Sequence, residues 1–182
     1  MRANGWKAAL ACFLLGTFCF TLLPWIGART ELIHWQLEPY FSSPISSPPD
    51  GISIRSDSYG KGYYGASRNG GRKHLGVDLS VEMGQPVFAS KSGRITFAGF
   101  DKGYGNFVKI AHPDGFSTRY AHLSQLFVAN GDWIPQGSMI GLSGKTGNAD
   151  HRLIKPHLHF EIRYSDTPLN PQGGWLRFIA KK

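Results

Sequence analysis

A short run near the C-terminal end, residues 155–163, constrains the fold of this chain more than any other segment. It reads Lys-Pro-His-Leu-His-Phe-Glu-Ile-Arg. Successive side chains of a β-strand point to opposite faces, so His157 and His159 would share one face while the apolar residues line the other. The run therefore predicts a strand with one chemical face and one core face.

Imidazole is neutral for much of the time near pH 7 and commonly binds zinc, so the pair indicates a metal site, a proton-transfer pair, or one of each. The alternative is a solvated strand that holds two histidines by chance. Upstream, His74 and Asp78 offer an imidazole and a carboxylate four residues apart. Together with either His157 or His159 they would supply the three protein ligands of a catalytic zinc site, which leaves a fourth position for water. Spacing alone does not distinguish the two histidines.

A further histidine, His122, ends a predicted strand in the run Tyr-Ala-His-Leu-Ser at residues 120–124. The motifs at residues 74–78, 120–124 and 157–161, taken in this order, closely resemble the lysostaphin/LytM-type zinc endopeptidases, which cut peptide bonds in bacterial peptidoglycan. The resemblance runs from about Ile54 to Trp175. Three separate motifs in one order are a much stronger signal than any one of them.

The resemblance implies one zinc ion per domain, bound by His74, Asp78 and His159. It places His122 and His157 off the metal, where they would orient or deprotonate the water and stabilise the oxyanion or protonate the leaving amine. Either histidine could take either role. The implied substrates are stem or cross-bridge peptides of peptidoglycan.

Three further residues are candidates for the site. Glu161 shares the strand face with both histidines, so it would hold one imidazole tautomer as a hydrogen-bond acceptor, with a surface salt bridge as the alternative. Tyr63 and Tyr64 lie in a Gly-rich approach to His74. The resemblance implies that this approach borders the substrate groove, and packed or surface aromatics are the alternative.

Two other functions stay open beside the endopeptidase. A non-catalytic cell-wall binding or activator module of the same fold would bind other hydrolases, and completeness of the ligand set argues against it. A zinc carboxypeptidase acting on stem peptides would share the metal chemistry and differ in where the substrate ends.

Glycine and proline are frequent along the chain, with 23 glycines and 11 prolines between β-branched and aromatic runs. This pattern favours short strands joined by turns, and hence a mainly β domain of antiparallel sheets around a groove with the zinc site. Strands are predicted near residues 86–89, 94–97, 107–111, 116–121 and 139–142. His112 begins the predicted hairpin turn before Gly115.

The N-terminal segment predicts export. Residues 8–26 lack charge and follow two basic residues, so residues 1–29 would be a signal peptide or an uncleaved signal-anchor forming an apolar helix. Residues 30–51 would be a juxtamembrane segment and a Ser/Pro-rich linker, and residues 52–182 the zinc endopeptidase domain. The expected location is the periplasm or cell envelope, with the inner membrane as a partner if the signal is not cleaved.

The formal net charge of +8 is compatible with an acidic polymer such as peptidoglycan, or with plain solubility. No nucleic-acid motif accompanies it, so no nucleic-acid partner is expected. Residues 143–147 resemble a phosphate loop without its leading glycine, which argues against a nucleotide. The link to the histidine strand, residues 148–155, is longer and more charged than is usual in the resembling family, and His151 within it is interpreted as a surface-loop residue.

Overall fold

The structure is a computed structural model that describes residues 38, 40–46 and 51–173 of the chain. The described residues form a mainly β domain in which every strand pair is antiparallel, as predicted. The strands are β1 (Ser56–Asp57), β2 (Gly60–Lys61), β3 (Val77–Ser80), β4 (Pro86–Phe88), β5 (Gly93–Asp101), β6 (Gly105–Ala111), β7 (Phe116–Leu126), β8 (Trp133–Ile134), β9 (Met139–Ser143), β10 (His157–Tyr164) and β11 (Thr167–Leu169). Two 3-10 helices accompany them, η1 (Asn69–Gly71) and η2 (Gly147–Ala149).

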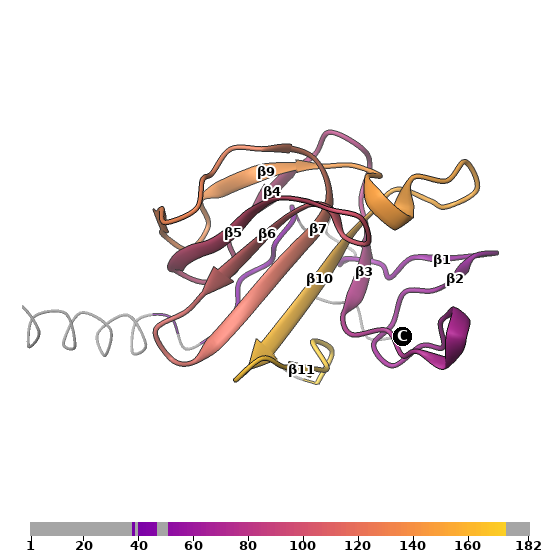
Figure 1. Ribbon diagram of the computed structural model, residues 1–182, viewed down its shortest axis with the longest axis horizontal. Coiled ribbons are helices and arrows are strands. Elements are labelled where there is room, and N and C mark those ends of the chain that lie inside the picture. Colours follow the sequence, from indigo (N-terminus) through magenta and orange to yellow (C-terminus); the bar gives the residue numbers. More distant parts are fainter. Residues whose placement is uncertain (1–37, 39, 47–50, 174–182) are drawn as a thin grey trace, which may run out of the picture. The chain divides into compact units, whose positions relative to one another are not determined.

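The main sheet is arranged around β10. Strands β11, β10, β7, β6, β5 and β8 lie in this order, and β3 pairs with the first half of β10 on the edge that β11 occupies further along. Figure 1 shows β5, β6, β7 and β10 side by side, with β4 and β9 crossing at one end of the sheet. The small β1–β2 hairpin is tied to β3 by backbone hydrogen bonds from Arg55 N to Asp78 O and from Asp78 N to Gly62 O.

The strand predicted from residues 155–163 is confirmed as β10, and its two faces differ as expected. Leu158, Phe160 and Ile162 are fully buried in the hydrophobic core. Burying one such side chain stabilises the fold by roughly 1.5–3 kcal/mol, so the core face fixes the direction of the opposite face. His157 and His159 therefore point together to the other side of the sheet.

The hairpin predicted around His112 is also confirmed. Its backbone N–H donates to Phe116 O at 2.9 Å and closes the turn between β6 and β7. The side chain is buried, with Nδ1 2.9 Å from Ser92 O and Nε2 3.0 Å from Thr118 Oγ1. His112 is thus a core histidine as well as a turn residue, a role that its position in a turn motif does not reveal.

Residues 41–46 pack against the β domain. They belong to the Ser/Pro-rich stretch interpreted as a linker, yet Phe41 and Ile45 are buried in the core. Ile45 forms a bridge with Val87, and Phe88 N donates to Pro44 O at 2.8 Å. The two apolar side chains explain the difference, because a free linker would leave them in water.

The predicted apolar N-terminal helix lies outside the described residues. Within the described part of the chain, no helix has the length and hydropathy needed to cross a membrane.

Candidate functional site

Strand pairing places the first two residues of the site. In the register between β3 and β10, Asp78 is the direct partner of His159. His74 precedes β3, and its backbone is held on both sides because its N–H donates to Ala66 O and its carbonyl accepts from Gly65 N. Two segments about eighty residues apart in sequence thus present their side chains to one point.

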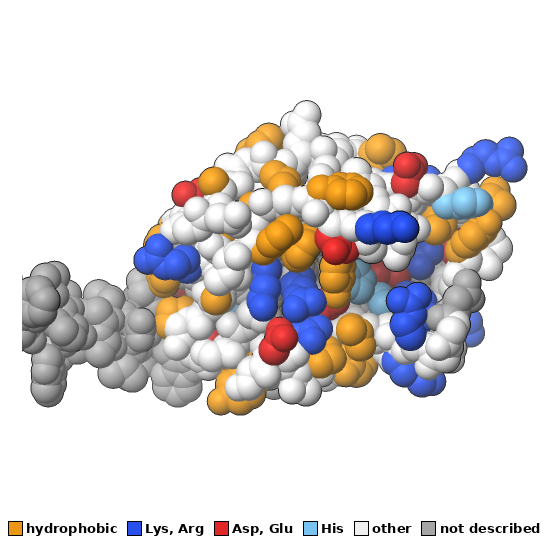
Figure 2. All heavy atoms as spheres, in the orientation of Figure 1, with side chains coloured by type: hydrophobic (Ala, Val, Ile, Leu, Met, Phe, Trp, Pro, Cys, Tyr) orange, Lys and Arg blue, Asp and Glu red, His pale blue; other side chains and the backbone are white. Residues whose placement is uncertain are grey.

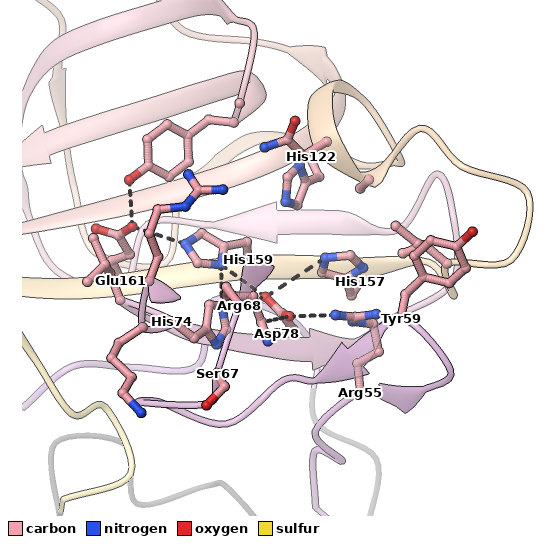
Figure 3. A pocket seen from close by; sticks show the side chains of 18 of the residues that line it. Arg55, Tyr59, Ser67, Arg68, His74, Asp78, His122, His157, His159 and Glu161 are labelled. Atoms are coloured by element: carbon pink, nitrogen blue, oxygen red, sulfur yellow. Dashed lines mark hydrogen bonds and ion pairs between the residues drawn. The ribbon is translucent and has the colours of Figure 1, made fainter. Parts of the chain in front are cut away.

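The three side chains meet through one atom each. His74 Nε2 lies 3.0 Å from Asp78 Oδ1, and His159 Nδ1 lies 2.9 Å from the same oxygen. The two imidazole nitrogens are 2.9 Å apart. All three residues are buried, and Figure 3 shows them converging from β3 and β10. Two nitrogens and one oxygen in this arrangement fit a zinc-type ligand set.

Each imidazole is oriented by a bond from its other nitrogen. His74 Nδ1 lies 3.0 Å from the backbone carbonyl of Tyr63, and His159 Nε2 lies 3.0 Å from Glu161 Oε1. A proton on each of these outer nitrogens leaves the inner nitrogen with a lone pair directed at the shared point.

Asp78 uses its two carboxylate oxygens differently. Oδ1 faces the histidines, whereas Oδ2 accepts hydrogen bonds from Arg55 Nη2 and Arg68 Nη2, both at 3.0 Å. Because the arginines occupy Oδ2, only Oδ1 is presented to a cation. Neither arginine was identified as a site residue from the sequence, since the contacts span 23 and 10 residues.

Glu161 is fully buried and makes polar contacts on several sides. Besides His159 it accepts a hydrogen bond from the Tyr104 hydroxyl at 2.8 Å and one from Arg163 Nη1 at 2.7 Å. The interpretation of Glu161 as a surface salt bridge therefore does not hold, because the side chain is inaccessible to water. Tyr104 and Arg163 are further residues that strand patterns alone did not identify.

The electrostatics of this cluster favour positive charge. Burial alone would lower the pKa of His159, but hydrogen bonds to Asp78 and Glu161 outweigh it and raise the pKa to about 9. Burial alone would raise the pKa of both carboxyls, yet the bonds to the histidines hold Asp78 well below its usual range and Glu161 at about 2. The same two carboxylates that favour a proton on His159 would favour a metal cation among these ligands.

The other two predicted histidines lie beside the cluster. The rings of His122 and His157 are 5.0 Å apart between centroids, and His157 Nε2 is 3.8 Å from Asp78 Oδ1. Their Nδ1 atoms lie 2.9 Å from Thr146 O and 2.8 Å from Lys155 O respectively. Burial lowers the pKa of His122 to about 3 and that of His157 to about 4, so both are neutral near pH 7.

His122 reaches the site because of an irregular backbone. Its φ of 64° lies in the left-handed region, within β7 next to register shifts against β6 and β9. Bulges of this kind re-aim a side chain that regular alternation would direct elsewhere. Figure 3 shows the imidazole directed at the same pocket as His157.

A pocket of about 590 Å³ surrounds these residues. Its lining includes Tyr59, Tyr104 and basic residues such as Lys73, and the space-filling view in Figure 2 shows histidines at the bottom of a hollow. The side chains of Tyr63 and Tyr64 are not part of this lining. The Tyr64 hydroxyl instead donates to Pro168 O at 3.0 Å, and Tyr63 contributes its carbonyl to His74.

Comparison with known proteins places this arrangement in a wider group. Residues 72–171 match the model of Peptidase family M23. The DD-carboxypeptidase/endopeptidase Mpg of Neisseria meningitidis is 46% identical over 100 residues, which are 55% of this chain and 22% of that protein. The murein hydrolase activator NlpD of Escherichia coli is 33% identical over 145 residues, which are 78% of this chain and 33% of that protein.

Among solved structures, the catalytic domain of the antimicrobial peptidase lysostaphin from Staphylococcus simulans is similar with a TM-score of 0.54. It is 37% identical, and the match covers 64% of this chain and 89% of that domain. The chain spans only about a fifth to a third of the length of the curated relatives named above. The residues that match the family model, 72–171, include the histidine cluster.

Proposed function

The chain belongs to peptidase family M23, and on that premise we propose that it hydrolyses peptide bonds of bacterial peptidoglycan with one zinc ion as cofactor. The observation that supports this most is the complete and buried ligand set of His74, Asp78 and His159. Each member has a second bond that orients it, which is typical of a functional metal centre.

Zinc held by these residues would supply a Lewis acid and make a water molecule more acidic near neutral pH. His122 and His157 would act around that water. With the proton on Nδ1, each has a lone pair on Nε2 that can accept a proton from water or hold it by a hydrogen bond. Once protonated, an imidazole can pass the proton to the leaving amine or stabilise negative charge on the carbonyl oxygen, and either division of roles fits the geometry.

Glu161 would keep His159 in the tautomer that presents Nδ1, and Arg55 and Arg68 would keep Asp78 Oδ1 turned to the site. These are positioning roles, because the three side chains act through another residue.

Two alternatives follow from particular relatives. NlpD is named an activator of murein hydrolases, so a non-catalytic module is the second candidate. Mpg is named a carboxypeptidase as well as an endopeptidase, so removal of a terminal residue from stem peptides is the third. The names of these relatives, which refer to murein hydrolysis and to peptide cleavage, also suggest action in the cell envelope, and a signal or anchor at residues 1–29 stays a prediction.

The test uses the full chain loaded with zinc and incubated with intact peptidoglycan, beside His159→Ala. Mass spectrometry of the released fragments should show crosslinked dimers converted to monomers by the unsubstituted chain, at a rate at least about a thousandfold higher than with the variant. Loss of a terminal residue alone would establish the carboxypeptidase. No product from a chain with one bound zinc would contradict hydrolysis and favour the activator.

Because His159 is buried, the variant is first compared with the parent by circular dichroism. Zinc removal by a chelator, followed by zinc addition to the same sample, gives a second comparison that needs no substitution.

A further inference from the structure

The loop before β10 is attached to the β1–β2 hairpin by two contacts. The Tyr59 hydroxyl lies 3.0 Å from His151 Nε2, and the two rings are 4.4 Å apart between centroids. Four residues further on, Lys155 N donates to Asp57 Oδ2 at 3.1 Å. We refer to these two contacts, Tyr59 with His151 and Asp57 with Lys155, as the clasp.

The clasp lies at one end of the pocket. Tyr59 on the hairpin lines it at the end that holds Arg55 and His157 (Figure 3), and Ile154 on the loop is also part of the lining. The contacts of the clasp thus join two sides of the pocket. A substrate that continued past this end would meet these contacts.

The loop side of the clasp is held in place by its own bonds. His151 Nδ1 accepts from Leu153 N at 3.2 Å, and the His151 carbonyl accepts from Lys145 Nζ and from Ile154 N, both at 3.0 Å. Since the ring and the backbone of His151 are both bonded within the loop, the imidazole is oriented toward Tyr59 before any substrate binds.

The hairpin side is connected to the metal ligands. Asp57 Oδ2, which accepts from Lys155 N, also pairs with Arg55 Nη1 at 2.5 Å. Arg55 Nη2 in turn donates to Asp78 Oδ2. The hairpin side of the clasp therefore shares Asp57 and Arg55 with the ion pairs that hold Asp78.

We propose that the clasp closes the pocket beside His157 and limits how far a substrate extends beyond that end. This inference rests on the proposed function and concerns the choice among its substrates. The site would favour a peptide with a short arm on that side over a peptide that continues past it. His151 and Tyr59 are then specificity-determining residues.

The first experiment compares peptides that share one scissile bond and differ in length on one side or the other. His151→Ala should raise kcat/KM by about tenfold, relative to the short peptide, for the peptide whose extension leads past the clasp. The reason is that a hydrogen bond and a ring contact no longer oppose its entry. His151→Gln, which retains a hydrogen-bonding group, should have a smaller effect. Arg152→Ala, an exposed neighbour in the same loop, should leave the ratio unchanged.

An unchanged ratio in His151→Ala with an active parent would overturn the inference and leave the proposed function intact. Absence of cleavage by the parent would instead contradict the proposed function. A second readout, amide hydrogen exchange, then tests the clasp without catalysis. The Lys155 amide should exchange about tenfold faster in His151→Ala than in the parent, and equal exchange would overturn the inference.

Discussion

Asp78 is a carboxylate that is both buried and ionised. A buried carboxylate is costly unless it is paired, and here both oxygens are paired in different directions. Arg55 and Arg68 compensate its charge at Oδ2, and the histidines face Oδ1. The carboxylate thus stays ionised and oriented, as a metal ligand must be.

Glu161 orients the imidazole of His159 by a hydrogen bond to Nε2. The effect of its negative charge can be tested separately. Glu161→Gln keeps the shape but removes the negative charge that accepts from His159 Nε2 and Arg163. We expect the Kd for zinc to rise by about 10–100-fold, measured by competition with a chromogenic chelator. The exposed Glu82→Gln serves as the matched control. Equal zinc affinity in the two variants would contradict a positioning role.

Away from the site, the buried His112 should make the stability of the fold sensitive to acid. Burial lowers its pKa from 6.5 to about 4, so between these values the unfolded chain binds the proton and the folded chain does not. The stability that the neutral ring contributes is present above pH 6.5 and is lost as the pH falls towards 4, by on the order of 3 kcal/mol.

The measurement is urea denaturation of the parent and of His112→Gln at pH 7 and pH 4, both with excess chelator. The advantage of the parent over the variant should shrink at the lower pH, because other histidines titrate in both proteins and cancel. A difference that does not depend on pH would contradict the prediction.

At the scale of elements, the pairing of β3 with β10 is the structural basis of the site. Gly76 stands just before β3, close to the backbone of β10. A Cβ at this position would lie 2.3 Å from Phe160 O and 2.9 Å from Glu161 Cγ. Only glycine allows Asp78 and His159 to become direct partners here.

Gly76→Ala should therefore destabilise the fold by about 1–3 kcal/mol and weaken zinc binding, because the strands must separate next to the ligands. Thermal unfolding and a zinc titration measure the two effects. Gly99→Ala in β5 is the control, since its nearest neighbours are ring atoms of Phe97 at 3.3 and 3.4 Å. Similar losses in both variants would show that the close approach at Gly76 is not special.

At the scale of the whole molecule, zinc binding and folding should be coupled. The ligands come from the segment before β3, from β3 and from β10, and they meet only in the folded chain. Zinc at a hundred times its Kd stabilises a fold by about 2.7 kcal/mol.

Removal of zinc by a chelator should accordingly lower the Tm by on the order of 10 °C, and zinc addition should restore it. Differential scanning calorimetry of the parent and of His159→Ala measures the effect. The variant should unfold at the same temperature with and without zinc. A zinc-dependent Tm in His159→Ala would argue for ligands other than those proposed.

Much of the domain could be predicted from the sequence because the relevant signals are local. Alternation in residues 157–163 predicts a strand with two faces, the residues around Gly115 predict a hairpin, and three ordered motifs identify the family. Each depends on side-chain period, on turn chemistry or on residue identity within a few positions. The proposed ligand residues could be selected at this level.

What only the tertiary structure decided depends on contacts between distant segments. Period-two alternation places His157 and His159 on the same face, and the register with β3 brings His159 Nδ1 to 2.9 Å from Asp78 Oδ1 while His157 Nε2 stays at 3.8 Å. Arg55, the burial of Ile45 and the clasp at His151 likewise depend on partners far along the chain. Local sequence carries no record of such partners, because strand register and loop docking are settled by packing of the whole domain.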